Sequence, residues 1–192
     1  MPKRIDLNQL FETTVRIYAE RGYSGTATLE VSHSAGVNEA TLYRRFGNKA
    51  NLIVAALSHC LAQSPMALLE ATNDLHNDLL TIVSAYKRTQ QLYGGAVVTM
   101  LNEVSHHPEL NEALTVMRAN TFKAVEIIMS HQEQGRLKST PPVQLVVYLL
   151  SPLMMTGLWN RTNEGSPSFD LAPADIVDNF LHGHQMQVDS ST

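Results

Sequence analysis

The side chains with the clearest chemistry are hydroxyl and basic groups gathered between residues 41 and 49. Leu42 and Phe46 are four residues apart there, so they predict the inward face of a short helix. The side chains left to point outward or sideways, with the lysine that follows them, are Thr41, Tyr43, Arg44, Arg45 and Lys49. Such groups donate hydrogen bonds to phosphates, and arginine also bonds guanine through two parallel hydrogen bonds. The cluster therefore predicts contacts with DNA.

The elements needed to position this cluster are two short helices that follow a longer one. Apolar residues at spacings of three and four predict a first helix over residues 6–21, which Gly22 ends. Either Thr26 or Thr28 is predicted to cap a short second helix, because a hydroxyl oxygen can accept from a backbone N–H at a helix start.

A glycine turn is predicted to separate the second helix from the third. The turn covers residues 35–37, where Gly36 supplies the backbone freedom. Asn38 is the predicted N-cap of a helix over residues 39–46, and Asn48 caps the helix after it. Two short helices about a tight turn form a helix-turn-helix, whose second helix enters the major groove of DNA.

The rest of the chain also predicts helices, and no alternating strand pattern of any length occurs in the sequence. The expected segments end near residue 63 and then lie near 73–93, 95–106, 108–134, 142–161 and 173–186. The fold class is therefore all-α with about nine helices in total. We expect a three-helix helix-turn-helix domain at residues 1–52, a helical body at 53–187 and a disordered polar tail at 188–192.

Composition and charge favour a DNA partner at one end of the chain. Hydrophobic residues make up 44% of the sequence, and aromatic residues make up 6%, which is too few for a stacking platform that binds single strands or sugars. The net charge is −4, yet residues 1–52 carry seven basic and five acidic residues, for a net charge of +2. A mildly basic amino-terminal part on an acidic body suits a polyanion at that end.

No membrane or disulfide role is expected from the sequence. The longest apolar stretch, residues 145–158, is interrupted by Ser151, Pro152 and Gly157 and is shorter than a bilayer span. The lone Cys60 has no second cysteine with which to form an internal disulfide. A cytoplasmic protein is the simplest expectation.

About the first quarter of the chain resembles the DNA-binding region of TetR/AcrR-type transcriptional regulators. The resemblance spans roughly residues 5–57 and rests on residues 17–23, on the pattern AGV…TLY..F..K over 35–49, and on Leu52. The positions that depart from the family pattern are Ala27, Val31, Ser32, Asn38 and Ala50. The resemblance implies a homodimer, an all-helical body that binds ligand and dimerises, and repression relieved by a small molecule.

Carried over by position, the resemblance implies DNA contacts from Thr28, Val37, Asn38, Ala40, Thr41, Tyr43, Arg44, Arg45 and Lys49. Tyr43 resembles the family's phosphate-binding tyrosine and Lys49 its backbone-contacting lysine. Arg44 and Arg45 stand at positions that vary in such families, so they are candidates for reading sequence. The alternatives are a packed tyrosine, solvated surface charges and a lysine paired along its own helix. Glu39 either compensates the helix dipole, accepts a hydrogen bond from a base, or disfavours wrong sequences.

Two late helices are strongly apolar, at residues 143–159 and 176–181. In proteins that resemble this family, the last two helices pair across a two-fold axis as a four-helix bundle. So broad an apolar face exceeds what one core surface requires, although a central helix buried within a monomer would also explain it. A two-fold dimer places two reading helices roughly one DNA turn (~34 Å) apart and requires a near-palindromic operator.

The family resemblance also implies a pocket for a small apolar ligand among the middle helices. Candidate lining residues are Tyr86, Met100, Leu101, Val104, Phe122, Met154, Met155 and Trp159. Ordinary core packing is the alternative for each of them. A ligand that fits one spacing of the two reading heads better than the other would shift the population and lower operator affinity.

No metal, cofactor or catalytic site is predicted. His106 and His107 are adjacent and so point about 100° apart on a helix, and His182 and His184 lie near the chain end. The sequence has no nucleophile elbow or glycine-rich phosphate loop. A metal-dependent helical enzyme and a helical interaction module that does not bind DNA remain the alternatives to a DNA-binding regulator.

Overall fold

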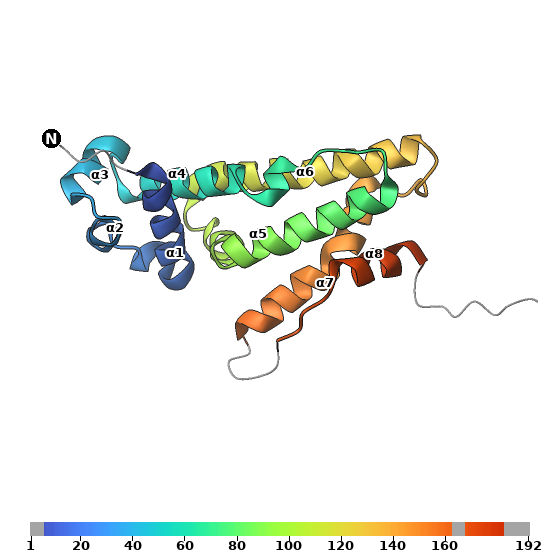
Figure 1. Cartoon of the computed structure of the whole chain (residues 1–192). Helices are drawn as coiled ribbons and strands as arrows, with labels where there is room; N and C mark the ends of the chain where they lie inside the picture. The colour runs from blue at the N-terminus through green and yellow to red at the C-terminus, as the bar shows by residue number, and fades with distance from the viewer. Residues whose placement is uncertain (1–5, 163–167, 183–192) are drawn as a thin grey trace, which may run out of the picture. The chain divides into compact units, whose positions relative to one another are not determined.

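The computed structural model describes residues 6–162 and 168–182 (Figure 1). Within these residues the chain forms eight α-helices and two short 3-10 helices, and no strand, which confirms the all-α prediction. The elements in order are α1 Leu7–Gly25, α2 Thr28–Ser34, α3 Glu39–Phe46, α4 Lys49–Ala62, η1 Pro65–Leu68, α5 Leu75–Glu103, η2 Pro108–Leu110, α6 Asn111–Glu133, α7 Pro142–Thr162 and α8 Pro173–His182.

The helices gather into two compact units. The first unit holds the chain up to Leu68 together with residues 89–122, and the second holds residues 69–88 together with the chain from Lys123 onward. The predicted boundary after residue 52 falls inside α4, so the two units do not bear on it and it stays a prediction. The predicted tail at 188–192 lies outside the described residues.

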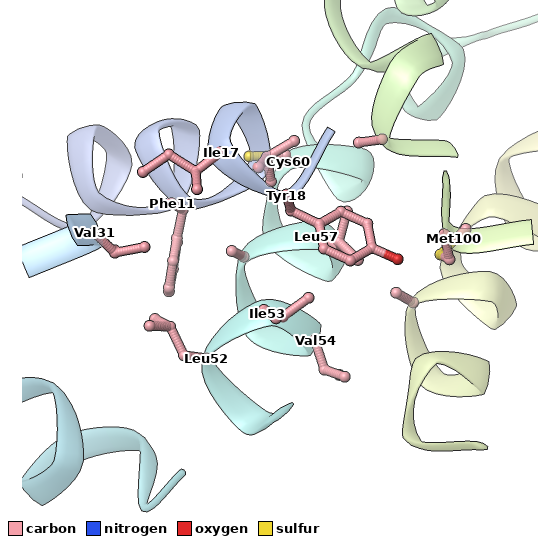
Figure 2. Close-up of a cluster of buried hydrophobic side chains, with 14 of the residues drawn as sticks. Phe11, Ile17, Tyr18, Val31, Leu52, Ile53, Val54, Leu57, Cys60 and Met100 are labelled. Carbon is pink, nitrogen blue, oxygen red and sulfur yellow. The ribbon is translucent and has the colours of Figure 1, made fainter. Parts of the chain in front are cut away.

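The first unit is organised around the packing of α1 on α4 (Figure 2). Leu10, Ile17 and Tyr18 from α1 are fully buried and meet the buried α4 side chains of Ile53 and Leu57. Val31 from α2, Leu42 from α3 and Met100 from α5 belong to the same apolar cluster. Burial of large apolar side chains stabilises a fold by about 1.5–3 kcal/mol each, so this cluster holds α2 and α3 against the α1–α4 pair.

The end of α1 is kinked at Gly22, in agreement with the predicted stop. Gly22 has φ +68° and ψ −175° inside α1, and helical hydrogen bonding resumes after it up to Gly25. A Cβ atom built on Gly22 would lie 2.5 Å from Oε1 of Glu103. The site therefore needs glycine for two reasons, its left-handed φ and the close approach of a side chain from α5.

Two helix predictions were wrong in detail. The N-cap of α2 is Ala27, which provides no side-chain cap, because the Thr26 hydroxyl donates to the Gly22 carbonyl and the Thr28 hydroxyl donates to Glu39. The Gly94-Gly95 pair does not divide α5, which runs without a break from Leu75 to Glu103. That is why eight α-helices are seen in the described part of the chain rather than about nine.

The second unit contains a buried polar contact between Asp78 on α5 and His131 on α6. Nε2 of His131 lies 2.8 Å from Oδ2 of Asp78, and both side chains are 1% exposed. The Asp78 carboxylate also accepts from the backbone N–H and the hydroxyl of Thr72. Burial alone would raise the pKa of Asp78, but the hydrogen bonds from Thr72 and His131 outweigh it and lower that pKa.

Helix α7 is apolar on two faces. One face packs inward through residues such as Leu149 and Leu153, and α7 packs against α8. Large apolar side chains of α7 that remain exposed are Val143, Val147, Tyr148, Met154, Met155, Leu158 and Trp159. In the part of the chain that the structure describes, α7 is also the one helix long and apolar enough to cross a membrane by length and composition, contrary to the length argument made from the sequence.

Candidate nucleic-acid interface

The turn between α2 and α3 is closed by hydrogen bonds that the predicted helix-turn-helix requires. The backbone N–H of Val37 donates to the carbonyl of Ser32 over 2.9 Å, and Gly36 adopts φ +65°. Oδ1 of Asn38 accepts from the backbone N–H of Ala40 over 2.8 Å, so Asn38 caps α3 as predicted. Helix α3 begins and ends at the predicted residues because these cap and turn signals are local in sequence.

Helix α3 presents a polar outer face and an apolar inner one. Leu42 is 2% exposed and anchors the inner face, and Phe46 packs edge-on against Phe11 of α1. Tyr43, Arg44 and Arg45 are exposed, as the outward direction of the predicted cluster requires. Of the other residues proposed to contact DNA, Asn38 and Ala40 are exposed, Val37 and Thr41 are half-buried, and Thr28 is buried.

Three of the residues at this interface are linked by hydrogen bonds between side chains. The hydroxyl of Thr28, the first residue of α2, donates to Oε1 of Glu39 over 2.6 Å. The same hydroxyl lies 3.1 Å from the phenolic oxygen of Tyr43. Glu39 is the first residue of α3, so the link joins the starts of the two helices next to the exposed phenol. The sequence indicated each residue but not that they touch.

Lys49, the first residue of α4, is held against the end of α1. Its ammonium group donates to the carbonyl of Tyr23 over 2.7 Å and lies 3.4 Å from the carbonyl of Ser24. The same nitrogen sits 4.7 Å from the centre of the Tyr23 ring, and the ring of His107 stacks against that ring at 3.6 Å. Lys49 therefore holds the first turn of α4 against the last turn of α1.

Glu103 is a residue that the sequence reasoning missed. Its carboxylate, at the end of α5, accepts from the buried hydroxyl of Tyr18 over 2.9 Å and from the backbone N–H of Tyr23 over 3.0 Å. Burial of Tyr18, followed by its hydrogen bond to the Glu103 carboxylate and the nearby negative charge, raises the Tyr18 pKa well above its ordinary value. Glu103 therefore ties α5 to the Gly22 kink in α1. No local sequence pattern signals it, because its partners lie 80 and 85 residues away.

The predicted ligand-lining residues are divided between the two units. Met100, Leu101, Val104 and Phe122 belong to the first unit, and Tyr86, Met154, Met155 and Trp159 belong to the second. Met100 is fully buried in the apolar cluster of the first unit, and Tyr86 and Val104 are half-buried. The other five are exposed, and the eight stay a prediction.

The second unit has a half-open cleft of about 650 Å³ between the α6–α7 connection, α7 and α8. Apolar side chains line much of it, including Leu145, Ile176 and Phe180, and Arg136 and Lys138 stand at its edge. None of the eight predicted ligand residues lines this cleft.

Metal ligands do not cluster among the residues described. No group of three or more histidine, cysteine, aspartate or glutamate side chains is placed to hold an ion there. His107 is engaged with the Tyr23 ring and lies 3.6 Å from Glu109, while His182 lies beside the carbonyl of Asp178. His184 lies outside the described residues.

Comparisons with known proteins agree with this arrangement. Residues 10–56 match the family model for bacterial regulatory proteins of the tetR family. An HTH-type transcriptional regulator of Mycobacterium bovis is 30% identical over 133 residues, which is 68% of this chain and 65% of that protein. The chain thus spans slightly less than two thirds of the length of that relative.

Solved structures share the fold over nearly the whole chain. The transcriptional regulator FadR from Bacillus subtilis, solved in complex with stearoyl-CoA, has a TM-score of 0.75 at 16% identity and covers 94% of this chain and all of its own. A transcriptional regulator from Saccharomonospora viridis, solved in complex with choline, has a TM-score of 0.73 at 18% identity and covers 93% of this chain and 97% of its own. Residues 10–56, which lie in α1–α4, therefore match the tetR family of bacterial regulatory proteins.

Proposed function

We propose that this protein is a cytoplasmic, homodimeric transcription repressor that binds double-stranded DNA through α3 and leaves it when a small molecule binds. The observation that carries the proposal is the geometry of α3, which buries Leu42 and presents Tyr43, Arg44 and Arg45 outward. Exposed arginines on a rigid helix that follows a tight turn can reach base edges in the major groove. The tetR family match over the same residues supports this use of the helix.

The DNA contacts we propose fall into two groups. Thr28, Tyr43 and Lys49 supply hydrogen-bond donors for phosphates, and Val37, Asn38, Ala40 and Thr41 are further proposed contacts with the DNA. Arg44 and Arg45 supply base contacts. Each good bidentate arginine contact discriminates against a wrong base by about 1–3 kcal/mol, whereas phosphate contacts add affinity for any sequence.

A second copy of the chain is the proposed partner of the exposed apolar face of α7. That face includes Val147, Met155 and Trp159, which would otherwise remain in water. A two-fold pairing of α7 and α8 would bury it and would also account for the apolar length of α7 without a membrane. Two reading helices then require two half-sites arranged as a near-palindrome.

A small apolar or amphipathic molecule is the proposed ligand. The fold is shared with FadR solved with stearoyl-CoA and with a regulator solved with choline, so the fold accommodates chemically different ligands in those proteins. The lining residues proposed for this chain are Tyr86, Met100, Leu101, Val104, Phe122, Met154, Met155 and Trp159. The protein would release DNA if the ligand binds more tightly to the dimer conformation that does not fit the operator.

The proposal is tested by selecting bound duplexes from a random-sequence pool with the purified full chain. We expect enrichment of a two-fold symmetric sequence, and loss of that enrichment in Arg44→Ala and Arg45→Ala variants that melt at the wild-type temperature. Repeating the selection with stearoyl-CoA or choline present tests the ligand step. A folded wild-type protein that enriches no sequence would overturn the proposal.

A further inference from the structure

We propose that Glu39 is a specificity-determining residue that withholds the Thr28 and Tyr43 hydroxyls from DNA unless a base-edge amino group takes over its carboxylate. This inference rests on the proposed DNA-binding function. It concerns the acidic residue that stands at the start of α3, where most residues expected to face DNA are neutral or basic.

The hydroxyl groups of Thr28 and Tyr43 can both donate their protons to acceptors inside the protein. Thr28 donates its single hydroxyl proton to Glu39 over 2.6 Å, so that proton cannot also reach a phosphate. The Thr28 oxygen can then accept from the phenol of Tyr43, which lies 3.1 Å away. Phosphate oxygens only accept hydrogen bonds, so a phosphate must compete with the Glu39 carboxylate for these donors.

Charge works in the same direction. A phosphate bound at Thr28 and Tyr43 would stand beside a carboxylate of the same sign. Like charges at such short range disfavour binding, and the partial burial of Glu39 limits screening by solvent. On DNA of arbitrary sequence, phosphate contacts supply nearly all the affinity. The repulsion between Glu39 and the phosphate therefore weakens non-specific binding directly.

A matched sequence offers Glu39 a different partner. The first residues of a reading helix are the ones that contact base edges, and Glu39 is the first residue of α3. A carboxylate accepts from the N4 amino group of cytosine. When Glu39 moves from Thr28 to such a group, the hydroxyls of Thr28 and Tyr43 are released for phosphates. The charge is then compensated only on the correct sequence.

Helix stabilisation is the ordinary alternative role for this residue. An acid in the first turn of a helix interacts favourably with the helix dipole, and that effect would alter the stability of α3 without altering sequence preference. The two roles are therefore separated by the ratio of the dissociation constant for random-sequence duplex to that for selected duplex, measured beside the melting temperature.

The experiment uses the full chain and the Glu39→Gln variant, which keeps an oxygen that can accept from Thr28 but removes the charge. The control is Glu12→Gln, which removes one charge from exposed α1 of the same unit. Duplexes are those selected by the wild type and a random-sequence pool. We expect Glu39→Gln to bind random duplex more tightly and its specificity ratio to fall by at least about fivefold, with the control within twofold of wild type.

A second selection with Glu39→Ala should lose the preference for cytosine at one position of each half-site. An unchanged ratio and an unchanged selected sequence in both Glu39 variants would overturn the inference and leave the proposed function standing. A wild-type protein that binds no duplex would overturn the proposed function, and this inference with it.

Discussion

The ammonium nitrogen of Lys49 lies 2.7 Å from the carbonyl oxygen of Tyr23 and 4.7 Å from the centre of the Tyr23 ring. This pair joins the first turn of α4 to the segment that follows the Gly22 kink. Lys49, which is proposed to contact a DNA phosphate, thus also helps to hold α4 against α1. Its substitution should be measurable without any DNA present.

Replacing Lys49 with methionine should destabilise the protein by about 1 kcal/mol, because the apolar stem is kept while the charged hydrogen bond and the cation–ring contact are lost. Thermal melting followed by circular dichroism measures this. Arg44→Ala is the matched control, since its exposed side chain should affect DNA binding and leave the melting temperature nearly unchanged. A methionine variant that melts with the wild type would show that the Lys49 contacts contribute no stability.

Glycine at position 22 should be far less replaceable than glycine at position 36, although their φ angles are +68° and +65°. A Cβ on Gly22 would meet Glu103 at 2.5 Å, whereas one on Gly36 would meet nothing within 4 Å. Gly36→Ala should cost about 1 kcal/mol for its backbone alone, and Gly22→Ala should cost clearly more. Chemical denaturation of both variants measures the difference, and equal losses would show that neither the ψ of −175° at Gly22 nor the Glu103 contact adds a cost.

The Asp78 carboxylate should stabilise the second unit in a pH-dependent way. Its pKa is lowered in the folded chain, so its contribution is present above the ordinary aspartate pKa and is lost as pH falls through the depressed value. At pH 7, Asp78→Asn should cost about 1–3 kcal/mol, since Thr72 and the buried side chain of His131 lose a charged acceptor. Urea unfolding from pH 7 to pH 3 should show the gap to wild type narrowing as pH falls. Asp175→Asn, at an exposed carboxylate of α8, should show almost no gap at any pH.

Cys60 should react slowly with thiol reagents. Burial, helped by the negative charge of Glu12, raises the pKa of the Cys60 thiol to about 11, and the side chain is 3% exposed. The thiolate is the reactive form, so little of it is present at pH 8. Modification by a disulfide reagent should be slow in buffer and complete within minutes in denaturant. Fast modification of the folded chain would contradict the burial of this residue in the α1–α4 cluster.

Met155→Glu should weaken self-association if the exposed face of α7 pairs with a second copy. A charge buried in that interface would raise the dimer dissociation constant by at least about tenfold. Leu68→Glu changes an exposed leucine outside α7 and should leave association unchanged. Light scattering across a dilution series reads out both variants. A monomeric wild-type protein that still protects a full palindrome in footprinting would contradict the dimer.

Local chemistry was readable from the sequence, and long-range contacts were not. Asn38 and Gly36 delimit α3 correctly because a cap and a turn depend on neighbouring residues. The prediction of a break in α5 at Gly94 was wrong. The packing of α5 outweighs the loss of helix stability, about 1 kcal/mol, that each glycine causes. The contact of Asp78 with His131 spans 53 residues and the contact of Glu103 with Tyr18 spans 85, so neither carried a local signal.

The candidate interface shows the same division. The outward direction of Tyr43 and the inward direction of Leu42 follow from helical periodicity alone. The hydrogen bond from Thr28 to Glu39 depends on how α2 crosses α3, and helical periodicity does not predict that crossing. Ligand-lining residues depend on how several long helices pack together, which no local sequence pattern specifies.

The central claim is that the exposed face of α3 and its surroundings bind duplex DNA, and the salt dependence of binding tests it most directly. Fluorescence anisotropy of a selected duplex, titrated with the full chain from 50 to 300 mM salt, gives the affinity at each concentration. The account predicts a straight line of log affinity against log salt, with a slope of about −0.9 for each phosphate contacted. Absence of binding at the lowest salt, or an affinity that does not change with salt, would contradict it.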